Sequence, residues 1–174
     1  MKKRMIGMSV LVLMVLLAFS SCGAAKTPYM VKNSAAYYRK GDQIYVSFKV
    51  NNPTKDIYYQ HVDQYDSLQH RVDDQWQMVE LTEAEKNFRK MALFAPEMEL
   101  LPANAETEVA ESLSKYQLTE GESYRLLVRA TTDEHDSNDS GLALELNFTY
   151  TLDALTIVNA DGSTRTVRLE ARAQ

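Results

Sequence analysis

Histidine and carboxylate side chains are the residues of this chain best suited to bind a metal ion or move a proton. His61 and Asp63 are two positions apart in a predicted strand, so their side chains lie on one face and could supply two metal ligands. A zinc site needs three or four ligands, and no third one lies in register. His70 lies between Leu68 and Val72, which favours a sheet histidine whose ring tip reaches water. We therefore expect no metal and no cofactor here.

A second group of polar residues falls in 133–141, with the sequence DEHDSNDSG. Asp136, Asn138 and Ser140 occupy positions one, three and five of a calcium-binding loop. Position twelve, where such loops carry a bidentate Glu, is Asn147 inside a predicted strand, and no helix precedes the loop. We interpret this segment as a solvated acidic turn, with a calcium loop as the alternative.

Tyrosines are the remaining side chains that could contact a ligand. Tyr45, Tyr58 and Tyr59 are candidate binding residues, because exposed aromatic rings on a sheet give a large contact area for a sugar ring or a peptide. Tyrosine also favours strands, so the same pattern is typical of an ordinary sheet. Trp76 could be a ligand platform as well, but its position after a turn favours a structural place in the core.

The single cysteine, Cys22, ends an N-terminal segment that resembles a secretory signal. Basic residues 2–4 precede an apolar run of about 15 residues, and two serines follow it. The run is short for a membrane span, which needs about 20 residues. Residues 19–22, FSSC, resemble the lipobox of bacterial lipoproteins, although Phe19 stands where lipoboxes most often carry Leu. The alternatives are an uncleaved anchor helix and a cytosolic protein with a buried cysteine.

The lipoprotein resemblance implies a membrane partner and a cellular address. Residues 1–21 would be removed, and a diacylglyceryl thioether on Cys22, with further acyl chains, would anchor the protein to a membrane. The thiol would then be neither a disulfide partner nor a nucleophile. Gly23 stands where an inner-membrane retention signal commonly places Asp, and no acidic cluster follows it. We expect a bacterial envelope protein at the outer membrane, facing the periplasm.

Charge and length limit the remaining function classes. The 174 residues carry a formal net charge of −5, and loss of the three basic leader residues, with no acidic one, changes it to −8. This balance argues against nucleic acid, which needs a basic face. A mature chain of about 150 residues is one domain, large enough to bury a core without disulfides.

Alternation of apolar and polar residues predicts mostly strands. The clearest are 44–50, ending at Asn51-Asn52-Pro53, and 142–152, where apolar residues fall at every second position. A hairpin is expected from 155–158 and 166–169, turned at Asp161-Gly162. One helix is expected at 83–93, capped by Thr82, because Ala84, Phe88, Met91 and Ala92 recur at helical spacing.

The segment LTEGESY, ending at Tyr124, predicts a tyrosine corner of the kind found in immunoglobulin-like sandwiches. There the phenol of a Tyr bonds to backbone a few residues upstream, and Gly121 would supply the backbone freedom. A plain core Tyr is the alternative.

In their order along the chain, the segments YVSFKVNNPTKDIYY, SLQHRVDDQWQMVE, LLPANAE and LTEGESYRLLV resemble a family of bacterial Ig-like domains, over about residues 40–152. The chain departs from the family at Ala103-Asn104, in the longer segment 82–96 and in the added hairpin. This family is usually found on exported, tethered proteins and has no settled chemistry.

Together these observations predict an all-β protein: an Ig-like (fibronectin type III or immunoglobulin-like) two-sheet antiparallel sandwich with one short helix and an added C-terminal β-hairpin. The expected parts are a lipoprotein signal peptide (1–21), an anchor and tether (22–36), the Ig-like domain (37–152) and the hairpin (153–174) packed on or beside it.

The sequence contains no GxSxG, HExxH, CxxC, P-loop or GxGxxG motif. We therefore expect no enzyme, but a non-enzymatic binding or scaffolding module for an unknown envelope protein or glycan. One alternative is an envelope hydrolase or hydrolase inhibitor that uses His61, Asp63 or the acids of 133–139. Another is a passive structural spacer.

Overall fold

The computed structural model describes residues 27–61, 68–91, 98–132 and 141–173, which form a 12-stranded sheet and one α-helix. The prediction of an all-β protein with one short helix is confirmed. The strands are β1 (Tyr29–Met30), β2 (Ala36–Lys40), β3 (Gln43–Asn52), β4 (Tyr58–His61), β5 (Leu68–Val72), β6 (Gln75–Met78), β7 (Met98–Leu101), β8 (Ala105–Ser112), β9 (Ser123–Thr131), β10 (Leu142–Tyr150), β11 (Ala154–Val158) and β12 (Thr164–Ala171). The helices are α2 (Glu83–Met91) and the 3₁₀ turn η1 (Leu113–Lys115).

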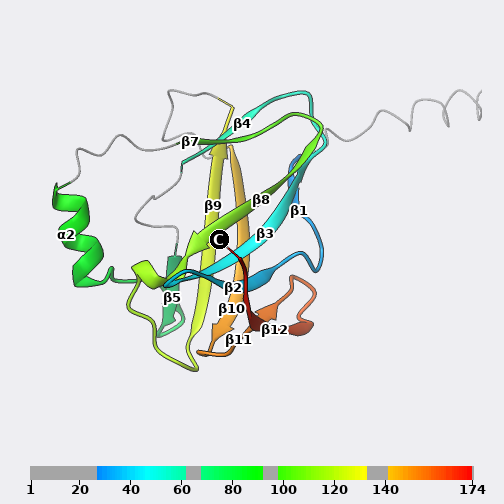
Figure 1. Ribbon diagram of the computed structural model, residues 1–174. Helices are drawn as coiled ribbons and strands as arrows, with labels where there is room; N and C mark the ends of the chain where they lie inside the picture. The colour runs from blue at the N-terminus through cyan, green and yellow to red at the C-terminus, as the bar shows by residue number, and fades with distance from the viewer. Residues whose placement is uncertain (1–26, 62–67, 92–97, 133–140, 174) are drawn as a thin grey trace, which may run out of the picture.

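The strands form one continuous sheet that curls into a half-barrel, rather than the expected pair of separate antiparallel sheets (Figure 1). The first half holds β1, β2, β3 and β8, and the second holds β4–β7 and β9–β11. β12 joins them, because 164–168 pair antiparallel with β11 while Leu169–Ala171 pair parallel with β2. The predicted hairpin is present, and its long second strand is the physical reason why the two halves are continuous.

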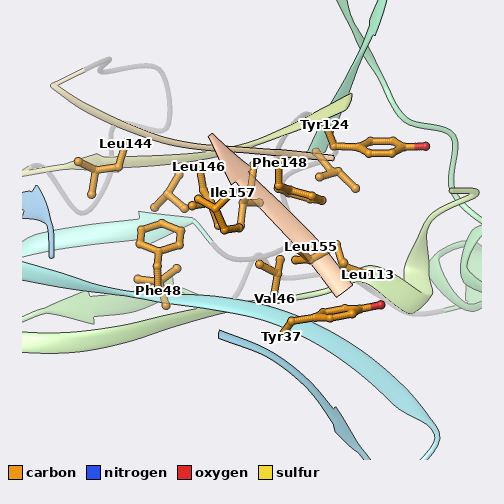
Figure 2. Packing of buried hydrophobic residues seen from close by; sticks show 14 of the residues in the cluster. Tyr37, Val46, Phe48, Leu113, Tyr124, Leu144, Leu146, Phe148, Leu155 and Ile157 are labelled. Carbon is orange, nitrogen blue, oxygen red and sulfur yellow. The ribbon is translucent and has the colours of Figure 1, made fainter. Parts of the chain in front are cut away.

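The core lies inside the curl, where alternate residues of strands from both halves meet (Figure 2). Phe48 on β3, Phe148 on β10 and Leu155 on β11 are each at most 1% exposed. This is the outcome expected from the period-two pattern of 44–50 and 142–152. Part of the segment predicted as a tether belongs to the sheet, since Tyr29 and Met30 pair with the end of β3.

Asn52 fixes the turn that ends β3. Its side chain is 1% exposed, and its Nδ2 group donates to the backbone oxygens of Asp56, Leu101 and Pro102 at 2.9, 3.1 and 3.1 Å. Its Oδ1 atom accepts hydrogen bonds from the backbone N–H and the hydroxyl of Thr54. One amide thus connects the β3–β4 turn to the segment that joins β7 to β8.

The predicted tyrosine corner has the expected geometry. Tyr124 is 1% exposed, and its phenol oxygen accepts a hydrogen bond from the backbone N–H of Thr119 at 2.8 Å. Gly121 has φ +82°, a left-handed conformation that favours glycine, and its N–H donates to the backbone oxygen of Tyr150. The corner therefore ties the approach to β9 to the end of β10.

Helix α2 begins and is capped as predicted but turns a different face inward. The backbone N–H of Glu85 donates to the Thr82 hydroxyl at 3.3 Å. Arg89 is buried and its Nε donates to the Glu85 carboxylate at 2.7 Å, whereas Phe88 and Met91 are 56% and 81% exposed. The apolar spacing therefore does not mark a core-facing stripe here, because the Arg89–Glu85 pair occupies the covered side. No helix in the described ranges is long and apolar enough to cross a membrane.

Candidate functional site

The outer face of the first half of the sheet carries an aromatic and charged cluster. We call it the stacked-tyrosine face and define it by Tyr38, Tyr45, Ser47, Glu108 and Arg172. Because Val46 and Phe48 of β3 point into the core, Tyr45 and Ser47 point outward. The register places Tyr38 opposite Tyr45, on the same face.

The two tyrosine rings and a guanidinium form a continuous stack. The rings of Tyr38 and Tyr45 are parallel within 14°, with centroids 5.4 Å apart. The guanidinium carbon of Arg172 lies 3.7 Å from the centroid of the Tyr38 ring, a cation–π contact. Tyr38 is consequently 7% exposed, while Tyr45 is half-buried and is the outer member of the stack.

Glu108 is held ionised beside this stack. The Ser47 hydroxyl donates to its Oε1 atom at 2.6 Å, and Arg172 Nη1 donates to the same atom at 2.9 Å. These two hydrogen bonds, that of Ser47 first, lower the pKa of the Glu108 carboxyl below its usual value. A carboxylate therefore lies next to an aromatic surface, and this combination can accept hydrogen bonds from a ligand while a ring packs on its apolar side.

The other predicted tyrosines do not join this face. Tyr58 and Tyr59 lie on β4, in the other half of the sheet. β4 follows the end of β3, whereas Tyr45 is near the start of β3. Tyr58 packs against the core. Tyr59, the next residue, is half-buried on the other face of β4, and its partner across the strand pair is Leu100. The structure thus separates the three candidate binding residues.

Trp76 is half-buried and outside the core cluster, which differs from its expected core position. The guanidinium carbon of Arg125 lies 4.7 Å from the centroid of its ring. Arg125 also donates to Gln69 Oε1, at 3.0 Å from Nε, and to Glu145 at 3.2 Å. Trp76 lies on β6, whose one partner among the described strands is β5, and Arg125 covers one side of the ring.

Among the histidine and acidic residues considered as candidates, His70 is the one whose side chain the structure describes. His70 Nδ1 lies 3.8 Å from Glu122 Oε2, and its ring stacks 6.4 Å from that of Tyr124. An open hollow of about 550 Å³ nearby is lined by Arg71, Asp73, Asp74, Glu122 and Ser123, and Arg71 is paired with Asp74. Within the four described ranges, no group of three His, Cys, Asp or Glu could hold a metal ion.

Several predicted site residues lie outside the described residues. Cys22, Asp63 and the calcium-loop candidates Asp136, Asn138 and Ser140 belong to this set, and of His61 the structure describes the strand but not the side chain. The predictions made on them stay predictions.

A recess at one end of the core was not predicted. It has a volume of about 170 Å³ and is lined by Ile44, Leu113, Ser114, Tyr116, Leu118 and Tyr150. These residues come from the start of β3, from η1 and the segment after it, and from the end of β10. The sequence carries no local signal for this recess, because its wall is assembled from three distant segments.

No family model matches this chain, and no curated protein shows significant similarity to it.

Proposed function

We propose that this chain is a lipid-anchored module of the bacterial cell envelope that binds another envelope component, a protein or a glycan, without catalysing a reaction. The leader-like residues 1–21 and Cys22 support a membrane anchor. The acidic net charge supports a partner other than nucleic acid. We place the protein at the outer membrane, facing the periplasm.

The observation that carries the binding role is the stacked-tyrosine face. Tyr45 and Tyr38 are stacked on paired strands, so little side-chain entropy is lost when a ligand packs on them. The Tyr45 hydroxyl donates to Gln43 Oε1 at 2.9 Å, which fixes the ring tip. Sugars and peptides both combine apolar groups with hydroxyl or amide donors. The Glu108 carboxylate lies next to the stack and can accept hydrogen bonds from these donors.

We also propose that the half-barrel is a variant of the bacterial Ig-like domain that the sequence resembles. The tyrosine corner at Tyr124 and the Asn-Pro turn at Asn52 support this relationship. The continuity through β12 would then be the departure of this chain from two separate sheets.

Site-specific photocrosslinking in intact envelopes tests the binding role. The full-length chain would carry p-benzoylphenylalanine at position 45, on the stacked-tyrosine face. The matched control would carry it at position 158, because Val158 is a strand residue that also reaches solvent (39% exposed) but lies on the other half of the sheet. We expect a discrete adduct from position 45 that is absent from position 158.

The nature of the adduct separates the two partner classes. An adduct that a glycan-degrading enzyme collapses is a glycan, and one that a protease collapses is a protein. Competition by excess unmodified chain should remove the adduct, and competition by the Tyr45→Ala chain should remove much less. Equal adducts from both positions, or none from position 45, would contradict the proposal and favour a passive spacer.

A further inference from the structure

The recess at the end of the core has fixed walls. Leu113, Tyr116 and Tyr150 are 2%, 5% and 7% exposed, so their side chains are packed on the core side. Figure 2 shows Leu113 at the end of the core toward which the hydroxyl tips of Tyr37 and Tyr124 also point. The recess therefore lies at the tyrosine-rich end of the half-barrel.

Hydrogen bonds fix each of the three wall segments in place. Ser114 Oγ accepts the backbone N–H of Ile44 at 2.9 Å, which joins η1 to the start of β3. The Tyr116 hydroxyl donates to Glu111 Oε1 at 3.1 Å, and the backbone N–H of Tyr150 donates to the oxygen of Glu122 at 3.0 Å. Because each segment is fixed independently of any ligand, the recess is formed before a ligand arrives.

The chemistry of the wall suits a neutral ring that also carries a polar group. Five of the six lining residues are aliphatic or aromatic and the sixth, Ser114, is exposed, but the wall presents polar and apolar atoms in about equal amounts. No lining side chain is charged at neutral pH, since the ordinary pKa of a tyrosine phenol is about 10 and burial raises that of Tyr150 further. The rings of Tyr116 and Tyr150 favour an aromatic guest over an aliphatic one, because ring pairs gain energy beyond the buried area.

The volume sets the size of the guest. An enclosed apolar cavity of about 150 Å³ binds benzene. This recess of about 170 Å³ is partly open to solvent, so it accommodates one six-membered ring whose small substituent faces the opening. We propose that this recess is a binding site for a single neutral aromatic ring of the size of 4-methylphenol. The shared chemistry covers a free phenol and the side chain of a tyrosine in a partner segment. This site is distinct from the stacked-tyrosine face and does not depend on the proposed function.

Methyl NMR on the full-length chain in lipid nanodiscs tests the site. The methyl groups of Leu113 and Leu118 report on the recess, and those of Val158 report on a remote strand. Titration with 4-methylphenol should shift the Leu113 and Leu118 signals saturably, with a Kd on the order of 1 mM for a guest of this size. The Val158 signals should stay in place. Shifts that do not saturate, or that are equal at Val158, would overturn the proposal.

Two variants distinguish binding in the recess from partition of the phenol into the lipid of the nanodisc. Partition into lipid affects the parent chain and its variants equally. Ile44 is a half-buried residue of β3, so Ile44→Trp places a larger side chain in the recess. This variant should weaken 4-methylphenol binding at least tenfold. Leu118→Ala enlarges it and should improve binding of 2-naphthol severalfold relative to 4-methylphenol. An unchanged Kd in Ile44→Trp, with a native methyl spectrum elsewhere, would overturn the site. If Ile44→Trp does not fold, an unchanged size preference in Leu118→Ala would overturn it.

Two further titrations identify the class and source of the guest. Cyclohexanol should bind the parent chain several times more weakly than 4-methylphenol, and equal binding would overturn the aromatic assignment. A short peptide containing tyrosine, against the same peptide with alanine, distinguishes a partner side chain from a free phenol. Saturable shifts from the tyrosine peptide but not from the alanine peptide indicate the side chain of a partner. Shifts from 4-methylphenol but from neither peptide indicate a free ligand, and both results support the site.

Discussion

Replacing Asn52 with alanine should destabilise the protein by about 2–3 kcal/mol. The carbonyl oxygens of Leu101 and Pro102 lose a donor at 3.1 Å, and the Leu101 bond is buried. A hydrogen bond contributes about 0.5–1.5 kcal/mol, and a buried acceptor left without a partner costs about 1–3 kcal/mol. The bonds to Thr54 and Asp56 are partly exposed, so water replaces much of their contribution.

Its neighbour Asn51 is a matched control. Asn51 is the same residue type on the same strand, but its Nδ2 group donates to the exposed hydroxyl of Tyr29. Asn51→Ala should therefore cost about 0.5 kcal/mol or less.

Urea unfolding of a chain that begins at residue 23 measures the difference. With an m-value of about 2 kcal/mol per M, the midpoint of Asn52→Ala should fall by about 1–1.5 M, with the m-value unchanged. Parallel measurement of Asn51→Ala controls for loss of an asparagine as such. If the two variants differ by less than about 0.5 kcal/mol, the reasoning that Asn52 connects the β3–β4 turn to the β7–β8 segment is wrong.

Three further outcomes are expected. Tyr124→Phe should cost about 1–2 kcal/mol in urea unfolding, because a backbone N–H at the corner loses its acceptor; Tyr45→Phe, which loses an exposed bond, should cost less than half as much. The carboxyl carbon of Glu108 should titrate below the usual Glu range in NMR, and Ser47→Ala should raise the pKa of Glu108; an unchanged pKa in this variant would contradict the assigned cause. The ionised Glu108 therefore stabilises the fold above the pKa of the unfolded chain, and this stabilisation is lost as the pH falls through the lower pKa of the folded protein. Cys22→Ala should leave the leader attached, so that the chain migrates as a larger species on gels; unchanged migration would count against processing.

Local patterns were sufficient to predict many of the elements. The alternation of 44–50 and 142–152 predicts the interior faces of β3 and β10, since a half-buried strand has a side-chain period of two. The Thr82 cap predicts the start of α2, and the spacing of Gly121 and Tyr124 predicts the corner. Each of these features depends on residues that are close together in the chain.

The features that were missed depend on distant segments. The parallel pairing of Leu169–Ala171 with β2 joins residues about 130 positions apart, and no local pattern specifies such a partner. The recess wall likewise combines Ile44, Leu118 and Tyr150. The core position predicted for Trp76 was wrong because β6 is at the edge of the described part of the sheet, where Arg125 covers the ring instead.

The candidate site was predicted in part. Its residue type makes Tyr45 a candidate binding residue, and it is the outer ring of the stacked-tyrosine face. Tyr38 is a local neighbour, on the strand β2 that directly precedes β3. Glu108 and Arg172 could not be predicted, because they come from distant parts of the chain. An aromatic residue on the polar face of an alternating strand is the one sequence signal that indicated this surface.

The central claim is that the mature protein begins at residue 22 with acyl chains on its sulfur atom. Mass spectrometry of the N-terminal peptide, taken from protein purified out of bacterial membranes, tests this most directly. The account predicts a peptide that begins at Cys22 and carries the added mass of a diacylglyceryl group. A peptide that contains residues 1–21, with a free thiol at Cys22, would contradict the lipid anchor and with it the proposed place of this protein in the envelope.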